Sequence, residues 1–315
     1  MQIDERVMDS QERIGFLLRT LYAGSGYSRY RMGKFEEYDL YSRNKDFLFS
    51  EGVITFTDTN GRLMALKPDV TLSIVKNTRD KAGELQKLYY HENVYRVASA
   101  EDGFREMTQV GVECMGDVDG PCVAEVLRLA AESLRACSEE YVLEISHLGL
   151  LGAFVDAIAS NEKMRDELLQ CVVEKNLHGI RRICAANGKS ENAAEPLCRL
   201  LSLYGTPKSV MPKIRALAED NGAAEYAEEL SQAAAAFAGS EAESRIRIDF
   251  SASGDVKYYN GIAFKGFISG IPGSVLSGGQ YDRLMRRMGR KDRAIGFAVF
   301  MNMLERLKEG GRTDD

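Results

Sequence analysis

The spacing of hydrophobic residues changes twice along the chain, and this limits the folds available to it. Short stretches typical of strands occupy much of the sequence up to about residue 149. From about Leu150 to Ser244 the sequence is rich in Ala, Glu and Leu at helical spacing, and strand-like stretches then return. We predict an α+β fold in which an antiparallel sheet with flanking helices, residues 1–149 and 245–315, is interrupted by a helical insertion, residues 150–244.

Individual elements are marked by periodicity and by turn residues. Apolar residues at helical spacing predict helices over 11–21 and 121–137. The segments 52–57 and 62–66 flank Asp58-Thr59-Asn60-Gly61, which predicts a hairpin with an Asn-Gly turn. Further strands are predicted over 87–96, 106–115, 141–145, 245–250, 261–267 and 294–299, the last leading into a helix near 302–307.

Composition and charge exclude several classes of protein. A chain of 315 residues, 44% hydrophobic and 28% charged, can bury a large core and is not disordered. The net charge of −6 provides no overall positive field to attract nucleic acid. No stretch approaches the roughly 18 uncharged apolar residues of a membrane span, and the first residues do not resemble a signal peptide. We expect a cytoplasmic protein whose partners are neither nucleic acids nor membranes.

The six cysteines and three histidines do not predict a metal site. No C-x-x-C pair occurs and the histidines are scattered, so we expect no structural zinc. Because a chain of this size needs no disulfides, we predict reduced thiols in the core. We predict that His147, which precedes the helical block, caps or packs a helix. No G-x-S-x-G motif supports a nucleophile, and we expect neither catalytic residues nor a cofactor.

Polar residues that interrupt apolar strand patterns mark three candidate clusters, because burying them without partners costs free energy. A strand that ends at Pro68 is expected to place Asp69 and Thr71 at the mouth of a sheet, where they can bind a ligand amine. The second cluster begins with Arg96, at the end of the predicted strand 87–96.

The following strand carries several polar residues on one face. Alternation places Arg105, Gln109 and Glu113 on the same side, and Gly111 leaves that side open between the last two. We therefore expect a ligand to fit over Gly111. Taken alone, each cluster is more typical of a solvated strand face or a turn than of a binding site.

A third cluster joins Tyr258-Tyr259 to Ser277-Gly278-Gly279-Gln280-Tyr281-Asp282. Adjacent residues of a strand point to opposite faces, so we predict that only one of the two tyrosines lines a pocket. The glycine pair permits close approach of the backbone but lacks the lysine of a phosphate loop.

In this order the clusters resemble the catalytic core of histidyl-tRNA synthetase and, more closely, its paralogue, the regulatory subunit of ATP phosphoribosyltransferase. The likeness runs from about residue 11 to 307. It is carried by Leu66-Lys67-Pro68-Asp69-Val70-Thr71, similar to the paralogue's Leu-Arg-Pro-Asp-Met-Thr, by the Gln-x-Gly-x-Glu strand at 109–113, by the tyrosine pair at 258–259, and by residues 277–282, similar to Gly-Gly-Arg-Tyr-Asp. The synthetase normally has glutamate where this chain has Asp69.

The resemblance implies a class II aminoacyl-tRNA synthetase-like fold and a homodimer. Gly26-Tyr27 and Phe35-Glu36 are similar to class II motif 1, the dimer-forming segment, although Gly33 stands in place of the usual proline. We also expect no anticodon-binding domain, since the chain ends at Asp315.

Departures from the synthetase pattern lie on the ATP side of the site. Ala98 replaces an expected glutamate, and Gly254 and Met303 replace expected arginines, with Arg306 about one helical turn after the last. Adenylate formation depends on cations that stabilise charge on the α-phosphate, so we expect no catalysis from this chain.

The resemblance therefore implies a non-catalytic regulatory subunit, required for the activity and histidine response of short-form ATP phosphoribosyltransferase, with the catalytic subunit as its partner. It also implies a site for free histidine, formed by Asp69, Thr71, Arg96, Gln109, Glu113, Tyr258 and Tyr259. The alternatives are a truncated histidyl-tRNA synthetase core, a free-standing histidine-sensing protein, and a pocket that keeps its outline without binding anything.

Overall fold

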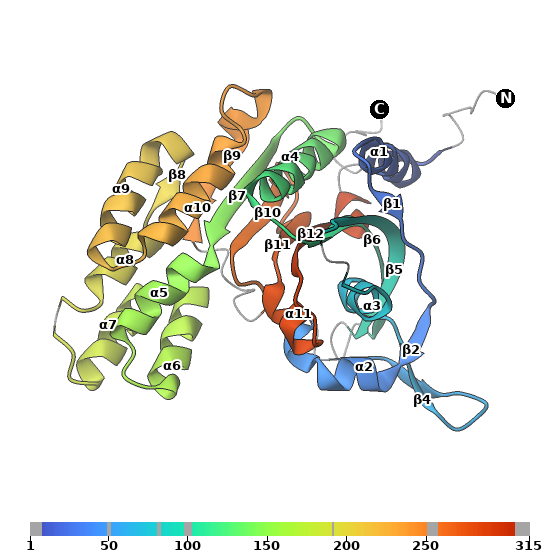
Figure 1. Cartoon of the computed structure of the whole chain (residues 1–315), viewed down its shortest axis with the longest axis horizontal. Coiled ribbons are helices and arrows are strands. Elements are labelled where there is room, and N and C mark those ends of the chain that lie inside the picture. The colour runs from blue at the N-terminus through green and yellow to red at the C-terminus, as the bar shows by residue number, and fades with distance from the viewer. Residues whose placement is uncertain are drawn as a thin grey trace, which may run out of the picture.

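A large twisted sheet forms the centre of the molecule (Figure 1). The structure is a computed structural model that describes residues 8–48, 52–80, 83–97, 103–190, 192–250 and 258–305. Within these residues nine strands pair in the order β1 (Ser28–Arg29), β5 (Gln86–Val97), β6 (Phe104–Gly116), β12 (Arg293–Phe300), β11 (Leu276–Gln280), β10 (Ile262–Ile268), β7 (Tyr141–His147), β9 (Ile246–Asp249) and β8 (Tyr204–Gly205).

The sheet is antiparallel through its middle and parallel at one pair near each end. The six strands from β5 to β7 are all antiparallel, as predicted. The pairs β1–β5 and β7–β9 are parallel, so the predicted antiparallel pairing does not extend to these two pairs. A parallel pair requires a long crossover, and the helical block supplies it between β7 and β9.

A second sheet, in the order β2 (Phe35–Glu37), β4 (Leu63–Leu66) and β3 (Thr55–Thr57), projects from one corner of the molecule (Figure 1). Strands β3 and β4 form the predicted hairpin. The Asp58 carboxylate accepts the N–H groups of Asn60 and Arg62, each at 2.8 Å, and Gly61 adopts a φ of 77°. The Asp-x-Asn-Gly sequence therefore closes the turn by its own local chemistry.

Helices cover both faces of the central sheet. On one face lie α1 (Ser10–Gly24) and α4 (Gly120–Cys137), and on the other α2 (Tyr38–Arg43), α3 (Thr71–Asn77) and α11 (Asp282–Arg287), with a short 3-10 turn at Lys45–Phe47 (Figure 1). Asp119 caps α4 by accepting the N–H of Cys122 at 2.9 Å. Val126, Leu127 and Leu134 of α4 are fully buried, as its spacing predicted.

The block between β7 and β9 contains α5 (Leu148–Ile158), α6 (Glu162–Val173), α7 (Leu177–Ala186), α8 (Glu195–Leu201), α9 (Pro207–Asp220), α10 (Ala224–Ala235) and a 3-10 helix at Glu241–Arg245. It lies beside the sheet rather than over the face that carries the polar clusters (Figure 1). It also contributes β8 to the edge of the sheet, so it is not purely helical. The division at 149/150 and 244/245 remains a prediction.

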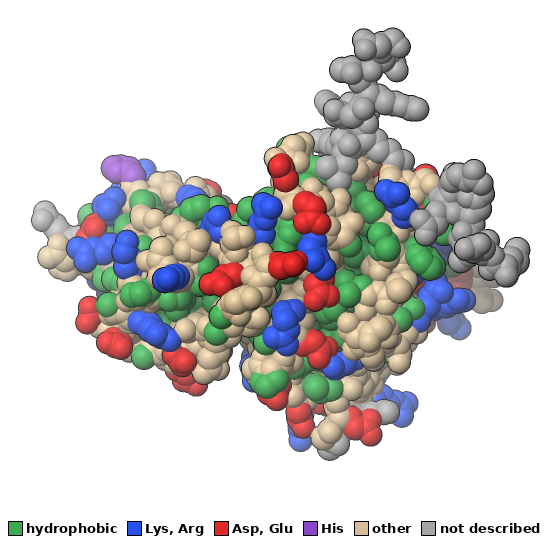
Figure 2. All heavy atoms as spheres, turned by 90° about the horizontal axis from the view of Figure 1, so that it is seen from above, with side chains coloured by type: hydrophobic (Ala, Val, Ile, Leu, Met, Phe, Trp, Pro, Cys, Tyr) green, Lys and Arg blue, Asp and Glu red, His purple; other side chains and the backbone are tan. Residues whose placement is uncertain are grey.

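After β12 the chain forms a 3-10 turn over 301–305, in place of the start of the predicted helix. Ala98, Gly254 and Arg306 lie outside the described residues. Among the helices that are described, none is long and apolar enough to cross a membrane. On the face drawn in Figure 2, Lys and Arg side chains are interspersed with Asp and Glu.

Candidate functional site

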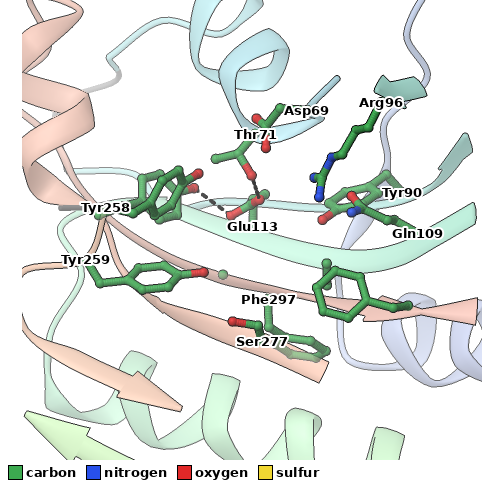
Figure 3. Close-up of a pocket in the computed structure, with 14 residues that line it drawn as sticks. Asp69, Thr71, Tyr90, Arg96, Gln109, Glu113, Tyr258, Tyr259, Ser277 and Phe297 are labelled. Atoms are coloured by element: carbon green, nitrogen blue, oxygen red, sulfur yellow. Dashed lines mark hydrogen bonds between the residues drawn. The ribbon is translucent and has the colours of Figure 1, made fainter. Parts of the chain in front are cut away.

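A small cavity lies on the face of the sheet opposite α4, between the start of α3 and strands β5, β6, β11 and β12 (Figure 3). Its volume is about 30 Å³. All seven residues predicted to form a site line it: Asp69, Thr71, Arg96, Gln109, Glu113, Tyr258 and Tyr259. The structure therefore brings together side chains that are up to 190 positions apart in the sequence numbering (69 to 259), while their role in binding histidine remains a prediction.

Glu113 is at the centre of this cavity. Its side chain is buried, and its two carboxylate oxygens accept hydrogen bonds from the hydroxyls of Thr71 and Tyr281, each at 2.6 Å. Burial raises the pKa of Glu113 to about 8, although both hydrogen bonds act to lower it. The group is therefore mostly protonated at neutral pH.

Two glycines allow the strands to pack closely around Glu113. A side chain at Gly296, directly across from Glu113 on β12, would overlap the Glu113 carboxylate. A Cβ at Gly111 would lie 2.6 Å from the Tyr90 hydroxyl oxygen. In this structure the hydroxyl end of the Tyr90 ring occupies the space over Gly111 where we expect a ligand, and that expectation remains a prediction.

The start of α3 positions Asp69 and Thr71, and the Asp69 side chain also takes part in the first turn of that helix. Asp69 accepts the N–H of Leu72 at 2.8 Å and so stabilises the first turn of the helix. Burial raises the pKa of Asp69, while this hydrogen bond and the Arg96 guanidinium oppose the rise. The carboxylate predicted to take a ligand amine thus already has a structural role.

Arg96 brings a positive charge to the rim of the cavity. Its Nε donates to the carbonyl oxygen of Pro68 at 3.1 Å, which ties the end of β5 to the segment before α3. Burial lowers the pKa of Arg96, and Asp69 opposes that effect. Arg105 shares a strand with Gln109 but lies exposed near the outer end of β6, outside the cavity.

Both tyrosines of the 258–259 pair line the cavity, so the prediction that only one of them would was wrong (Figure 3). They precede β10 in irregular backbone, where strand alternation does not apply. Their rings meet edge to face with centroids 4.8 Å apart. Gly279 makes room for Tyr259, since a Cβ there would lie 2.8 Å from the ring.

Several lining residues lie outside the predicted histidine site, among them Ser277 and Tyr281, which belong to the third cluster, and Tyr90 and Phe297, which belong to none of the clusters. Tyr90 pairs with Gly111 across β5 and β6, and a large aromatic residue opposite a strand glycine is a recognisable sequence signal once the register is known. The Ser277 hydroxyl is buried and has no hydrogen-bond partner among the described residues. It is a polar group facing the cavity that a ligand or water can satisfy.

The cavity in its present form holds about two water molecules, since each needs roughly 10–15 Å³ of such space. An amino acid fits only if side chains around it move.

Two other sequence predictions concern features outside the cavity. His147 caps α5 by accepting the Leu150 N–H at 3.1 Å, which confirms its predicted role. Five cysteines are buried and none forms a disulfide in the described part of the chain.

Comparisons with known proteins identify relatives of this chain. A family model described as histidyl-tRNA synthetase matches residues 3–304. A protein of Clostridium kluyveri named ATP phosphoribosyltransferase regulatory subunit is 29% identical over 308 residues, covering 95% of this chain and 78% of the relative.

Solved structures share the fold. One described as an ATP phosphoribosyltransferase regulatory subunit/histidyl-tRNA synthetase from Bacillus halodurans has a TM-score of 0.82 and 25% identity, covering 94% of this chain and 79% of the other. A chain of an ATP phosphoribosyl transferase complex from Thermotoga maritima has a TM-score of 0.73 and 17% identity, covering 91% and 96%. The predicted fold class, an antiparallel class II synthetase-like sheet with flanking helices, is confirmed by these likenesses.

Proposed function

Because this chain belongs to the histidyl-tRNA synthetase family, we propose that it is the non-catalytic regulatory subunit of a short-form ATP phosphoribosyltransferase. That enzyme joins ATP to phosphoribosyl pyrophosphate in the first step of histidine biosynthesis, in the cytoplasm. One observation carries the proposal: several relatives named as this regulatory subunit match more than nine tenths of the chain and at least 74% of their own length.

The partner in this proposal is the catalytic subunit. The Thermotoga maritima structure is described as a complex, and one of its chains has the fold seen here. This supports a role in which the fold contributes a binding surface and not an active site, since a fold by itself is compatible with many functions.

Two features of the chain support the absence of adenylate chemistry. Met303 stands where the resemblance places an arginine, and its side chain packs against the hydrophobic core. Loss of one preorganised charge donor typically reduces a rate by about 10²–10³-fold. In addition, the Glu113 carboxylate is already bonded to Thr71 and Tyr281 and is mostly protonated, so it does not present a free charge to an amino acid.

The decisive experiment is reconstitution. The chain and the short-form catalytic subunit from the same genome are purified separately, mixed, and assayed for phosphoribosyl-ATP formation with and without histidine. We expect the catalytic subunit to be weakly active alone, to co-elute with this chain, and to gain activity and histidine inhibition on mixing. If the two proteins elute separately and activity is unchanged, the proposal is wrong.

A second assay separates the regulatory subunit from the truncated synthetase core. The chain alone is tested for histidine-dependent exchange of pyrophosphate into ATP, with an intact histidyl-tRNA synthetase as the positive control. We expect no exchange above background. Exchange at a rate comparable to that of the control would assign the chain to the synthetase.

We further propose that the cavity around Glu113 is the remnant of an amino-acid pocket. It retains the carboxylates, the Gln109 amide and the two tyrosines that suit an ammonium and an imidazole. Free histidine then binds weakly, because Tyr90 and its neighbours have to move before the ligand can enter.

A further inference from the structure

Two cysteines meet in the core behind the candidate site. Cys114 lies on β6 and Cys122 lies in the first turn of α4, and their sulfur atoms are 2.9 Å apart. Non-bonded carbon atoms usually stay about 3.5–4.0 Å apart, so the fold holds these thiols in unusually close contact. Both belong to residues that are at most 4% exposed.

The chain reversal between β6 and α4 produces this contact. Gly116 has a φ of 127°, a conformation that favours glycine, and its backbone passes close to the carbonyl of Glu84. Asp119 then caps α4 and accepts the N–H of Cys122. The two sulfurs are thus positioned by a turn and a helix cap, and not by flexible segments.

The surroundings favour a reactive thiol at this position. Lys87 pairs with Cys114 across β5 and β6, and its ammonium group binds Glu125 of α4 at 2.7 Å. The hydrogen bond from Cys114 lowers the pKa of the Cys122 thiol, against the effect of burial and of the Glu125 charge, while Lys87 acts in the same direction as the hydrogen bond. Cys122 also lies at a helix N-terminus, where negative charge is stabilised.

We propose that Cys114 and Cys122 are a redox-active dithiol that peroxide converts reversibly to an intrachain disulfide. The Cys122 thiolate attacks one oxygen of hydrogen peroxide, the O–O bond breaks, and a sulfenic acid and hydroxide form; the hydroxide takes up the proton released when the Cys122 thiol ionised and becomes water. The Cys114 sulfur then attacks the Cys122 sulfur, the S–O bond breaks, the hydroxyl group leaves as water with the Cys114 thiol proton, and the S–S bond forms. The two thiols lose two electrons, peroxide gains them, and a dithiol reductant reverses the reaction.

This dithiol is independent of the proposed function, but Cys114 lies on β6, the strand that also carries Glu113. Cys114 follows Glu113 directly, so the disulfide links the first turn of α4 to the back of the strand that carries the cavity's central carboxylate. Disulfides in reducing compartments are typically transient and redox-sensing, which is the behaviour proposed here.

The chain offers a direct test by mass spectrometry. Cys114 and Cys122 lie in one tryptic peptide, residues 106–128, because no Lys or Arg separates Arg105 from Arg128. The reduced full-length protein is treated with hydrogen peroxide, unfolded, alkylated and digested. We expect this peptide to lose two hydrogen atoms in mass and to escape alkylation, and dithiothreitol to restore two alkylated cysteines.

Variants and a control assign the result to the folded pair. Cys122→Ser should leave Cys114 open to alkylation after peroxide, whereas Cys137→Ser, on the same helix, should leave the disulfide unaffected. The reaction should be at least about tenfold faster in the folded protein than in urea, because the fold supplies the proximity. Two alkylated cysteines in peptide 106–128 after oxidation, a sulfinic acid at Cys122 without the disulfide, or equal rates in urea would each overturn the proposal.

Discussion

Glu113 combines features that rarely occur together in one side chain. It is buried, it accepts two short hydrogen bonds from hydroxyls, and its pKa is raised to about 8. Asp69 raises this pKa further by charge repulsion, after the dominant effect of burial. The site therefore holds a proton at neutral pH that a cationic ligand has to displace.

This protonation makes stability depend on pH. Glu113 binds its proton more tightly in the folded chain, with a pKa of about 8, than in the unfolded chain, so its stabilising contribution is complete below about pH 4.5 and falls as pH rises towards 8. The change is on the order of 5 kcal/mol. Glu113→Gln removes this titrating group. We therefore expect the melting temperature of the variant, relative to that of the wild type at the same pH, to rise as the pH is raised from 5.5 to 8.5.

Thermal denaturation followed by circular dichroism across this pH range measures the effect. Glu132→Gln, an exposed position on α4, is the matched control and should follow the wild-type pH dependence. A constant difference in melting temperature between Glu113→Gln and wild type would contradict the raised pKa.

Histidine binding provides a second prediction for the same residue. If histidine occupies the cavity, its ammonium pairs with Asp69 or Glu113 and its ring lies near Tyr258 or Tyr259. Glu113→Ala then weakens binding by about 2–3 kcal/mol, or roughly 30- to 150-fold in Kd. Calorimetry at pH 8.5, where Glu113 is more fully ionised, checks this. Unchanged binding in both Glu113→Ala and Gln109→Ala would place the histidine site elsewhere.

At the scale of single elements, His147 shows how a side chain at a junction secures a helix. Its Nδ1 accepts the Leu150 N–H at the start of α5, and its Nε2 donates to Glu229 of α10 at 3.0 Å. The ring also packs against Tyr226, with centroids 5.2 Å apart. One residue thus caps α5 and joins it to α10, at the point where β7 leads into the helical block.

We expect His147→Ala to destabilise the protein by about 2 kcal/mol, because the variant loses the cap and leaves a small cavity. Urea denaturation measures the free energy of unfolding. The control is His178→Ala on α7, whose exposed side chain should change stability by no more than about 0.5 kcal/mol. Equal effects of the two variants would show that the His147 contacts contribute little.

At the scale of the whole molecule, an exposed apolar surface supports the proposed homodimer. Phe35 and Phe56 of the small projecting sheet are 55% and 37% exposed, and their rings meet with centroids 5.2 Å apart. Phe35 lies in the segment that resembles motif 1, which in class II synthetases forms the dimer. An exposed aromatic pair of this kind is typical of an interface between subunits.

We therefore expect a particle of about twice the 35.0 kDa chain mass in light scattering at micromolar concentration. Phe35→Ser should shift the population towards monomer, because it removes one half of the exposed aromatic pair. Tyr204→Ser is the control, since Tyr204 is 56% exposed on the opposite part of the molecule. A monodisperse 35.0 kDa species for the wild type would contradict the dimer.

Features that depend on local interactions could be predicted from the amino-acid sequence. The hairpin at the Asn-Gly turn, the buried face of α4 and the paired strands β5 and β6 follow from turn chemistry and periodicity, which act over a few residues. Polar residues within apolar patterns marked three clusters, and the resemblance to histidyl-tRNA synthetase selected the seven candidate site residues from them.

The contacts between distant segments could not be predicted from local patterns. Contacts between residues far apart in the chain set the strand order and the parallel pairs near both edges. They also place the Tyr90 ring over Gly111 and both Tyr258 and Tyr259 in the lining of the cavity. The pKa of Glu113 likewise depends on burial and on hydroxyls contributed by α3 and Tyr281. Periodicity specifies which face of a strand is apolar, but the neighbours of that face are set by the packing of the whole chain.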